Sequence, residues 1–183
     1  MCRYAMKQYK GHYACFDCRK TFKRRRVEDI NGKSGSDTVA KCQQCGGPMA
    51  DMGLDFESPM SSDMKTWSHI NDLYSVGITF HSCGCSGPGY IPKDSQALLK
   101  YLEDCRNAYS QHLKFWRDHQ EPSSESDLQK DWNKNAAILS QVPSELWKRE
   151  SIRAKSFPPN NVEAVNYWIS RLHDIDERIK MIS

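Results

Sequence analysis

The sequence predicts an α+β protein: a cysteine-rich, strand-forming N-terminal part, a small mixed extension and a mainly α-helical C-terminal half. Two observations predict this order. Residues 1–60 combine cysteine pairs, glycines and basic residues with short runs that suit β-strands. Residues 93–183 repeatedly place apolar side chains at helical spacing. The length of 183 residues suits one domain, or one small domain with a helical partner.

In the first segment, residues 1–60, we expect three short strands. Residues 12–16 and 20–23 flank the first cysteine pair, and residues 38–41 precede the second. Residues 31–36, Asn-Gly-Lys-Ser-Gly-Ser, predict a polar turn, because Asn-Gly and Ser-Gly steps favour positive φ angles.

The mixed extension covers residues 61–92, and it contains a predicted helix, a strand and a glycine-rich turn. Residues 61–63, Ser-Ser-Asp, predict the start of the helix, and Gly77 predicts its end. Residues 78–80 are an apolar run that predicts a strand, and residues 83–89 form the turn that follows.

The third segment, residues 93–183, predicts helices that are separated by polar or proline-containing breaks. The first helix carries an apolar stripe, on which we expect Cys105 to lie in the core; the stripe consists of Leu98, Leu102, Cys105, Tyr109, Leu113 and Trp116. A second helix is expected over residues 127–140, a short third from Pro143, and a last one after the Pro-Pro step at residue 158. The apolar seam of the last helix consists of Val165, Ile169, Leu172, Ile175, Ile179 and Ile182.

Two Cys-x2-Cys pairs are the strongest chemical signal in the chain. The first pair is Cys15 and Cys18, and the second is Cys42 and Cys45, with 23 residues between the pairs. Each such turn presents both sulfurs to one side, so that four thiolates converge tetrahedrally on one Zn²⁺. The Gly-Gly step after Cys45 suits a tight turn that aims backbone N–H groups at the sulfurs. We therefore predict one structural Zn²⁺, with an iron–sulfur or rubredoxin-type iron centre as the alternative.

On these residues the chain resembles a zinc ribbon, the module found in several ribosomal proteins, transcription factors and RNA polymerase subunits. The resemblance covers about residues 10–60 and rests on the sequences Cys15-Phe-Asp-Cys18 and Cys42-Gln-Gln-Cys45-Gly-Gly. It implies an N-terminal zinc ribbon with four cysteine ligands within the α+β fold. The resemblance is specific for fold and metal and says little about function.

A basic run, residues 19–26, lies between the two cysteine pairs and predicts a contact with nucleic acid. It holds six basic residues around one aromatic. In a strand, Lys20, Phe22 and Arg24 share one face, which suits phosphate contacts with a stacking ring. The alternative is a solvated edge strand whose lysines oppose aggregation. The predicted nucleic-acid-binding residues are Arg19, Lys20, Phe22, Lys23, Arg24, Arg25 and Arg26.

A second candidate site contains Cys83 and Cys85 on the glycine-rich turn and His81 just before it. Three interpretations stay open at this point. Both cysteines could pack as small apolar residues, or the group could bind a second metal ion, completed by Cys2, His12 or His69. The turn could also expose a thiol for redox or catalytic chemistry.

Charge is distributed unevenly along a chain whose net charge is +3. Residues 1–45 hold eleven basic and four acidic residues, residues 46–92 hold one and five, and residues 93–183 hold fourteen of each. A polyanionic partner would therefore meet the N-terminal part first.

We expect a cytoplasmic protein with no membrane partner. No apolar run approaches the roughly 18–20 residues that span a bilayer, and the N-terminus lacks the apolar stretch of a signal peptide. Thiols stay reduced in the cytoplasm, where cysteine clusters more often bind metal than form disulfides.

These features favour a non-catalytic protein that associates with nucleic acid, most of all with RNA or a ribonucleoprotein, because ribbons with basic hairpins resemble ribosomal parts. The alternative is an interaction adaptor, in which the ribbon is structural and the C-terminal helices bind a protein partner. No catalytic residues are predicted, since the sequence lacks a Ser-His-Asp ordering, a phosphate-binding loop and a His-Glu-x-x-His motif. A thiol-dependent activity at Cys83 or Cys85 stays open.

Overall fold

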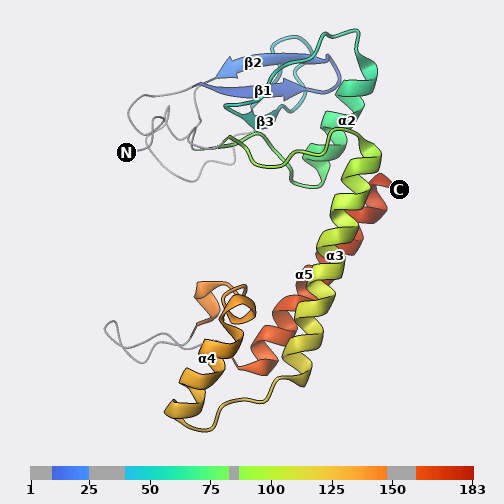
Figure 1. Cartoon of the computed structure of the whole chain (residues 1–183). Coiled ribbons are helices and arrows are strands. Elements are labelled where there is room, and N and C mark those ends of the chain that lie inside the picture. Colours follow the sequence, from blue (N-terminus) through green and yellow to red (C-terminus); the bar gives the residue numbers. More distant parts are fainter. Residues whose placement is uncertain (1–9, 25–39, 83–86, 148–159) are drawn as a thin grey trace. The chain divides into compact units, whose positions relative to one another are not determined.

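The computed structural model describes residues 10–24, 40–82, 87–147 and 160–183 (Figure 1). The mixed α+β class predicted from the sequence is confirmed. The chain divides into an N-terminal unit, Met1–Leu99 with Ile182, and a helical unit, Lys100–Met181 with Ser183. In chain order the described elements are β1 (Gly11–Cys15), β2 (Lys20–Arg24), β3 (Ala50–Gly53), α2 (Met64–Ser75), α3 (Ser95–Asp118), α4 (Glu125–Leu139), the 3-10 turn η2 (Ser144–Leu146) and α5 (Asn161–Ile182).

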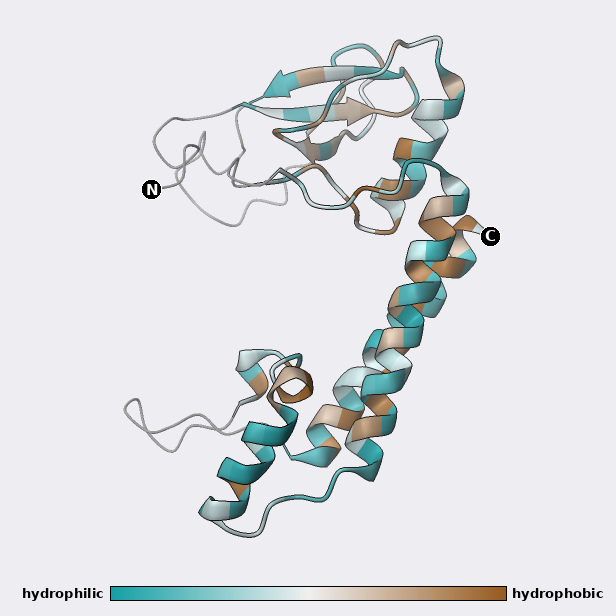
Figure 2. Cartoon of the chain, in the orientation of Figure 1, coloured by the Kyte–Doolittle hydropathy of each residue, from teal (hydrophilic) through white to brown (hydrophobic). Residues whose placement is uncertain are grey.

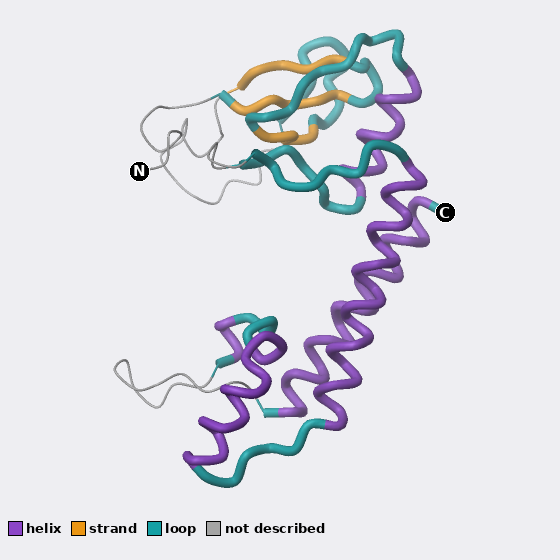
Figure 3. The backbone as a smooth tube through the Cα atoms, in the orientation of Figure 1, coloured by secondary structure: helices purple, strands orange, loops and turns teal. Residues whose placement is uncertain are grey.

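The N-terminal unit is built on an antiparallel sheet with the strand order β2-β1-β3 (Figure 3). β1 and β2 lie within one residue of the strands predicted around the first cysteine pair. The strand predicted over 38–41 differs: Lys41 makes only an isolated bridge with Pro48, and residues 38 and 39 lie outside the described residues. The third strand is instead Ala50–Gly53, which lies along β1.

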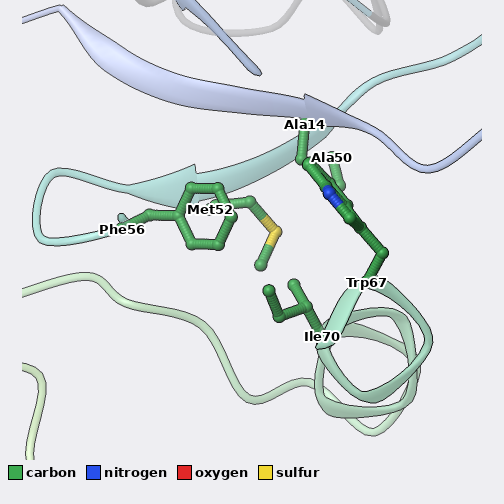
Figure 4. Close-up of a cluster of buried hydrophobic side chains, with 6 residues drawn as sticks. All are labelled: Ala14, Ala50, Met52, Phe56, Trp67 and Ile70. Atoms are coloured by element: carbon green, nitrogen blue, oxygen red, sulfur yellow. The ribbon is translucent and has the colours of Figure 1, made fainter. Parts of the chain in front are cut away.

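The two faces of this sheet bury different groups of side chains. Paired residues share a face, so Tyr13 and its partner Phe22 lie on one side and Ala14 with its partner Ala50 on the other. The first side carries the cluster Tyr13, Cys15, Cys42 and Met49. The second side packs against α2 through Ala14, Ala50, Met52, Phe56, Trp67 and Ile70 (Figure 4).

Helix α2 confirms the helix predicted after Ser61. The Asp63 carboxylate caps its first turn, accepting a hydrogen bond from the Thr66 N–H at 3.1 Å. Trp67 is buried on its inner face, and Gly77 follows the helix end with a φ angle of +81°. The segment 78–80 was predicted as a strand and is not one, although the Phe80 N–H donates to the Met52 carbonyl at 2.8 Å.

In the helical unit, α3 and α5 run antiparallel (Figure 1). Three side-chain contacts between them, and a fourth from His119 directly after α3, fix their register. Arg106 pairs with Asp176 at 2.6 Å, and Arg171 donates to the Tyr109 hydroxyl at 2.9 Å. His112 stacks on Trp168, and the His119 ring lies 3.0 Å from the Asn161 side chain. Both helices carry hydrophobic residues among hydrophilic ones along their length (Figure 2). The core that joins them to α4 consists of Leu113, Trp116, Leu139, Val142, Ala164 and Trp168.

The sequence predicted most helix boundaries in this unit to within two residues. The last helix begins after the proline pair with a capping box, in which Asn160 and Glu163 exchange side-chain-to-backbone hydrogen bonds. The short helix after Pro143 is a single 3-10 turn. Cys105, expected in the core, is only half-buried, as is Tyr109 one turn further on. Both lie in the middle of α3, between the buried pair Leu98 and Leu102 and the buried pair Leu113 and Trp116. Within the described residues, no helix is both long and apolar enough to cross a bilayer.

Candidate metal centre

The four predicted metal ligands, Cys15, Cys18, Cys42 and Cys45, lie in two turns of the N-terminal unit. Cys15 is the last residue of β1, and Cys18 sits in the turn that leads into β2. The second pair occupies a turn that precedes β3. Cys15 and Cys42 are buried, Cys18 is half-buried and Cys45 is exposed. We call these residues the four-cysteine cluster.

The sulfur positions of the four-cysteine cluster fit a tetrahedral metal site. All four Sγ atoms lie within 4.8 Å of one another. The distance is 3.6 Å between the Cys15 and Cys45 sulfurs and 4.0 Å between those of Cys42 and Cys18. A tetrahedral zinc ion with bonds of about 2.3 Å separates its sulfurs by about 3.8 Å. These sulfur separations are therefore compatible with one such ion.

Backbone hydrogen bonds hold the second turn in this geometry. The Cys42 N–H donates to the Gly47 carbonyl at 2.8 Å, and the Gly46 N–H donates to the Cys42 carbonyl at 2.9 Å. Gly46 has a φ of +75°, a conformation that L side chains rarely adopt. The Gln44 N–H lies 3.4 Å from the Cys42 sulfur, the kind of contact that stabilises a thiolate.

The sulfurs differ in how readily they ionise. Hydrogen bonds from the backbone N–H groups of Cys45 and Gln44 lower the pKa of Cys42 to about 7. The side-chain hydrogen bond with Cys45 is the main cause that raises the pKa of Cys18 to about 12. Burial raises the pKa of Cys15. Neighbouring thiols thus compete for negative charge, and a divalent cation would remove that competition by stabilising every thiolate, with release of protons.

No significant match to this chain is found among family models, curated proteins or solved structures.

The second candidate site is only partly described, because Cys83 and Cys85 lie outside the described residues. The His81 ring lies 3.4 Å from the Asp51 carboxylate and 2.9 Å from the Thr79 hydroxyl. His69, considered as a further ligand, lies 2.8 Å from the Pro92 carbonyl. Within the described residues, the four-cysteine cluster is the only group of three or more ligands close enough to hold a metal ion.

The basic run begins directly beside the four-cysteine cluster, and its members differ in their surroundings. Lys20 and Lys23 are exposed on the edge strand β2. Arg19 donates from Nε to the Ser61 carbonyl at 2.9 Å, and Arg24 donates from Nη1 to the Lys41 carbonyl at 3.0 Å. Half-buried Phe22 packs against the cluster of Tyr13, Cys15, Cys42 and Met49. Arg25 and Arg26 lie outside the described residues.

The structure also contains a polar cluster that the sequence did not indicate. In the helical unit, the His119 Nε2 atom lies 3.0 Å from both carboxylate oxygens of Asp131 on α4. Asn135 donates to the same carboxylate at 2.6 Å. The His119 Nδ1 atom lies 3.0 Å from the side-chain oxygen of Asn161. These residues come from three separate segments, and no regular spacing in the sequence signals their convergence.

Proposed function

We propose that this chain is a zinc-ribbon protein that associates with RNA or a ribonucleoprotein through β2. One structural Zn²⁺ would be held by Cys15, Cys18, Cys42 and Cys45. Four thiolates complete a tetrahedral shell and leave no coordination position for substrate, so the ion would serve the fold rather than catalysis. The sulfur separations of 3.6 and 4.0 Å support this assignment.

The RNA proposal rests on two exposed lysines of β2, a strand that begins beside the four-cysteine cluster. Lys20 and Lys23 are exposed, and neither forms an ion pair with any described residue. Arg19 and Arg24 each use one donor on a backbone carbonyl, and a guanidinium has five. In this proposal their remaining N–H groups contact phosphates.

In this proposal Phe22 both packs on the core and stacks on a base of the RNA. Part of its ring packs on the core beside the four-cysteine cluster, which fixes the ring's orientation. The rest stays accessible, and this accessible part would stack on a base. A Phe22→Leu variant would keep most of the packing and remove the stacking surface.

The test is RNA binding by a Lys20→Ala/Lys23→Ala variant over a series of salt concentrations. Each lost contact with a single-strand phosphate should reduce the slope of log K against log salt by about 0.7. We expect the double variant to bind more weakly and to lose about 1.4 from the slope. Lys65→Ala/Lys93→Ala is the matched control, because it removes two exposed positive charges from the same unit.

An unchanged slope in the Lys20 and Lys23 variant would refute the β2 assignment. If neither the unmodified chain nor the Lys20→Ala/Lys23→Ala variant binds RNA at low salt, the nucleic-acid proposal as a whole is refuted. The metal assignment is measured separately, as metal content per chain. We expect one zinc ion per chain. Iron in its place would favour the alternative metal centre. A second zinc ion would indicate that Cys83 and Cys85 form a second metal site.

The adaptor function stays a second candidate, because α5 exposes apolar side chains. Val162 is 67% exposed and Ile169 is 45% exposed, and two full helical turns between them place both on one helix face. A Val162→Asp/Ile169→Asp variant should lose a protein partner under this function. Replacement of Arg24, Arg25 and Arg26 by Ala should leave that partner bound, whereas it should abolish polyanion binding under the first function.

A further inference from the structure

An open groove runs between the end of α3 and the facing side of α4 in the helical unit. Its volume is about 580 Å³, within the range of small-ligand sites in proteins. Lys114, Phe115 and Asp118 contribute from α3, His119 from the residue after it, and Asp131 and Lys134 from α4. This groove is remote in sequence from the basic run and plays no part in the function proposed above.

The floor of the groove is polar and buried, and its polar side chains contact one another at hydrogen-bonding distance. The side chains of His119 and Asp131 are 8% and 14% exposed. His119 contacts the Asp131 carboxylate through Nε2 and the Asn161 side-chain oxygen through Nδ1, each at 3.0 Å. The Asn161 amide N–H₂ donates back to the His119 carbonyl, which fixes the orientation of the amide. The His119–Asp131 pair therefore serves as a rigid base for the groove.

One wall is an aromatic ring held in place by its neighbours. Phe115 stacks on the His119 ring at a centroid distance of 5.0 Å and an interplanar angle of 30°. It also meets Trp116 edge-on, at 5.6 Å and 84°. Phe115 stays half-buried and lines the groove. A ring fixed in this way is a stacking platform that needs no further ordering when a flat ligand binds.

The rims of the groove carry two exposed lysines. Lys114 on α3 and Lys134 on α4 are exposed, and neither forms an ion pair within the part of the chain that the structure describes. Nearby Lys130 differs, since it pairs with Asp127 at 3.2 Å. The exposed Asp118 offers an acceptor to an amino group of the ligand.

We propose that this groove binds one nucleotide of a single-stranded RNA. The base would stack on Phe115, and Lys114 and Lys134 would hold the adjoining phosphate. A nucleotide uses both the ring and the lysines, whereas an inorganic anion or an acidic peptide needs only the lysines. The choice of RNA as ligand rests on the proposed function, while the site itself is separate from β2.

The test uses fluorescence anisotropy with a labelled 12-nucleotide single-stranded RNA and the full chain. Phe115→Leu removes the aromatic ring but keeps an apolar side chain of similar volume. We expect it to weaken binding about tenfold, the lower part of the range for loss of one base stack. Lys114→Ala/Lys134→Ala should weaken binding and reduce the salt slope by about 0.7, the contribution of one single-strand phosphate. Lys100→Ala/Lys130→Ala is the matched control in the same unit and should leave affinity within about twofold of the unmodified chain.

The outcomes separate this inference from the proposed function. If Phe115→Leu binds RNA with wild-type affinity and Lys20→Ala/Lys23→Ala loses binding, the groove is not a nucleotide site, and the proposal for β2 is unaffected. The reverse pattern would support the groove and overturn β2. Weaker binding by the Lys114 and Lys134 variant, with unchanged affinity in Phe115→Leu, would show a simple anion site and contradict the nucleotide proposal. Equal displacement of RNA by polyglutamate from the unmodified chain and from Phe115→Leu would do the same.

Folding of the variants is checked by circular dichroism. Should Phe115→Leu fail to fold, ultraviolet crosslinking of a 5-iodouridine RNA to the unmodified chain replaces it. A crosslinked peptide that contains Phe115 supports the inference, and crosslinks confined to β2 overturn it.

Discussion

Cys15 and Cys45 have sulfurs 3.6 Å apart, yet they differ in burial: the first is fully buried at the end of β1 and the second is exposed. Both would contribute one thiolate to a bound ion. Only Cys15 also fills space in the core beneath the sheet, next to Tyr13 and Met49. The same chemical role is thus combined with different structural roles.

Replacement of either cysteine by serine should abolish stoichiometric zinc binding, measured as metal content per chain. Cys15→Ser should in addition destabilise the N-terminal unit by about 1–3 kcal/mol relative to Cys45→Ser, because it leaves a hydroxyl in an apolar site. Urea unfolding of the two variants in excess zinc, which the three remaining thiolates still bind weakly, measures that difference. Cys105→Ser is the control and should keep its zinc; loss of zinc there would contradict the assignment.

His112 is the residue whose burial predicts a pH effect. Its ring stacks on Trp168 with centroids 4.4 Å apart and an interplanar angle of 9°. Burial lowers the pKa of His112 below its ordinary value, because the apolar surroundings disfavour the imidazolium. The unfolded chain therefore binds the proton more readily than the folded one.

The stabilisation from neutral His112 is fully present above the unfolded pKa of about 6.5 and is lost as pH falls below it. We expect the helical unit to unfold at lower temperature as the pH is lowered from about 7 to 5, and His112→Gln to reduce that dependence. The difference between the two proteins isolates His112 from His119, which faces Asp131. Identical pH profiles would contradict the prediction.

At the scale of elements, Gly53 shows how the end of β3 meets the segment that follows α2. Gly53 has a φ of +91°, and a Cβ atom there would lie 2.5 Å from the His81 nitrogen and 2.6 Å from the Phe80 oxygen. The atoms that it would meet belong to the backbone, which cannot move aside without disturbing its neighbours. Gly53 is therefore required both by its φ and by the close approach of the second segment.

Gly53→Ala should destabilise the N-terminal unit by about 2 kcal/mol or more, since it combines backbone strain with a collision. Gly89→Ala separates the two causes. Gly89 has a φ of +83° with open space around it, so this variant should cost only about 1 kcal/mol. Denaturant unfolding of the metal-loaded proteins gives both values, and equal costs would show that the contact with Phe80 is unimportant.

At the scale of the molecule, the two units depend on different forces. In the residues that the structure describes, the N-terminal unit has a small sheet packed on α2, and a metal ion would replace core that it lacks. The helical unit instead contains a core of tryptophans, leucines and smaller apolar residues, closed by ion pairs and side-chain caps. Removal of metal should therefore affect the units unequally.

A zinc chelator should accelerate amide hydrogen exchange throughout β1, β2 and β3 and leave α3 and α5 protected. The physical reason is that zinc binding supplies folding free energy, about 10–16 kcal/mol in small zinc modules at neutral pH. Mass spectrometry of peptides from each unit measures the exchange. An equal loss of protection in α3 would show that the helical unit also depends on the ion.

Features that depend on neighbours along the chain could be predicted from the sequence alone. The Cys-x2-Cys turns predicted sulfurs that converge, and the four Sγ atoms do lie within 4.8 Å. Apolar spacing and capping residues predicted the main helices, because a helix makes its hydrogen bonds within about four residues. β1 and β2 were predictable for the same reason, since one tight turn joins them.

Features that depend on distant partners required the tertiary structure. The short run at residues 50–53 has little strand propensity and becomes β3 because β1 offers it an edge. Phe22, predicted on a binding face, also packs beside the four-cysteine cluster because β1 brings Tyr13 opposite to it. The groove at Phe115 arises where α3 meets α4, and contacts between separate helices leave no periodic trace in the sequence.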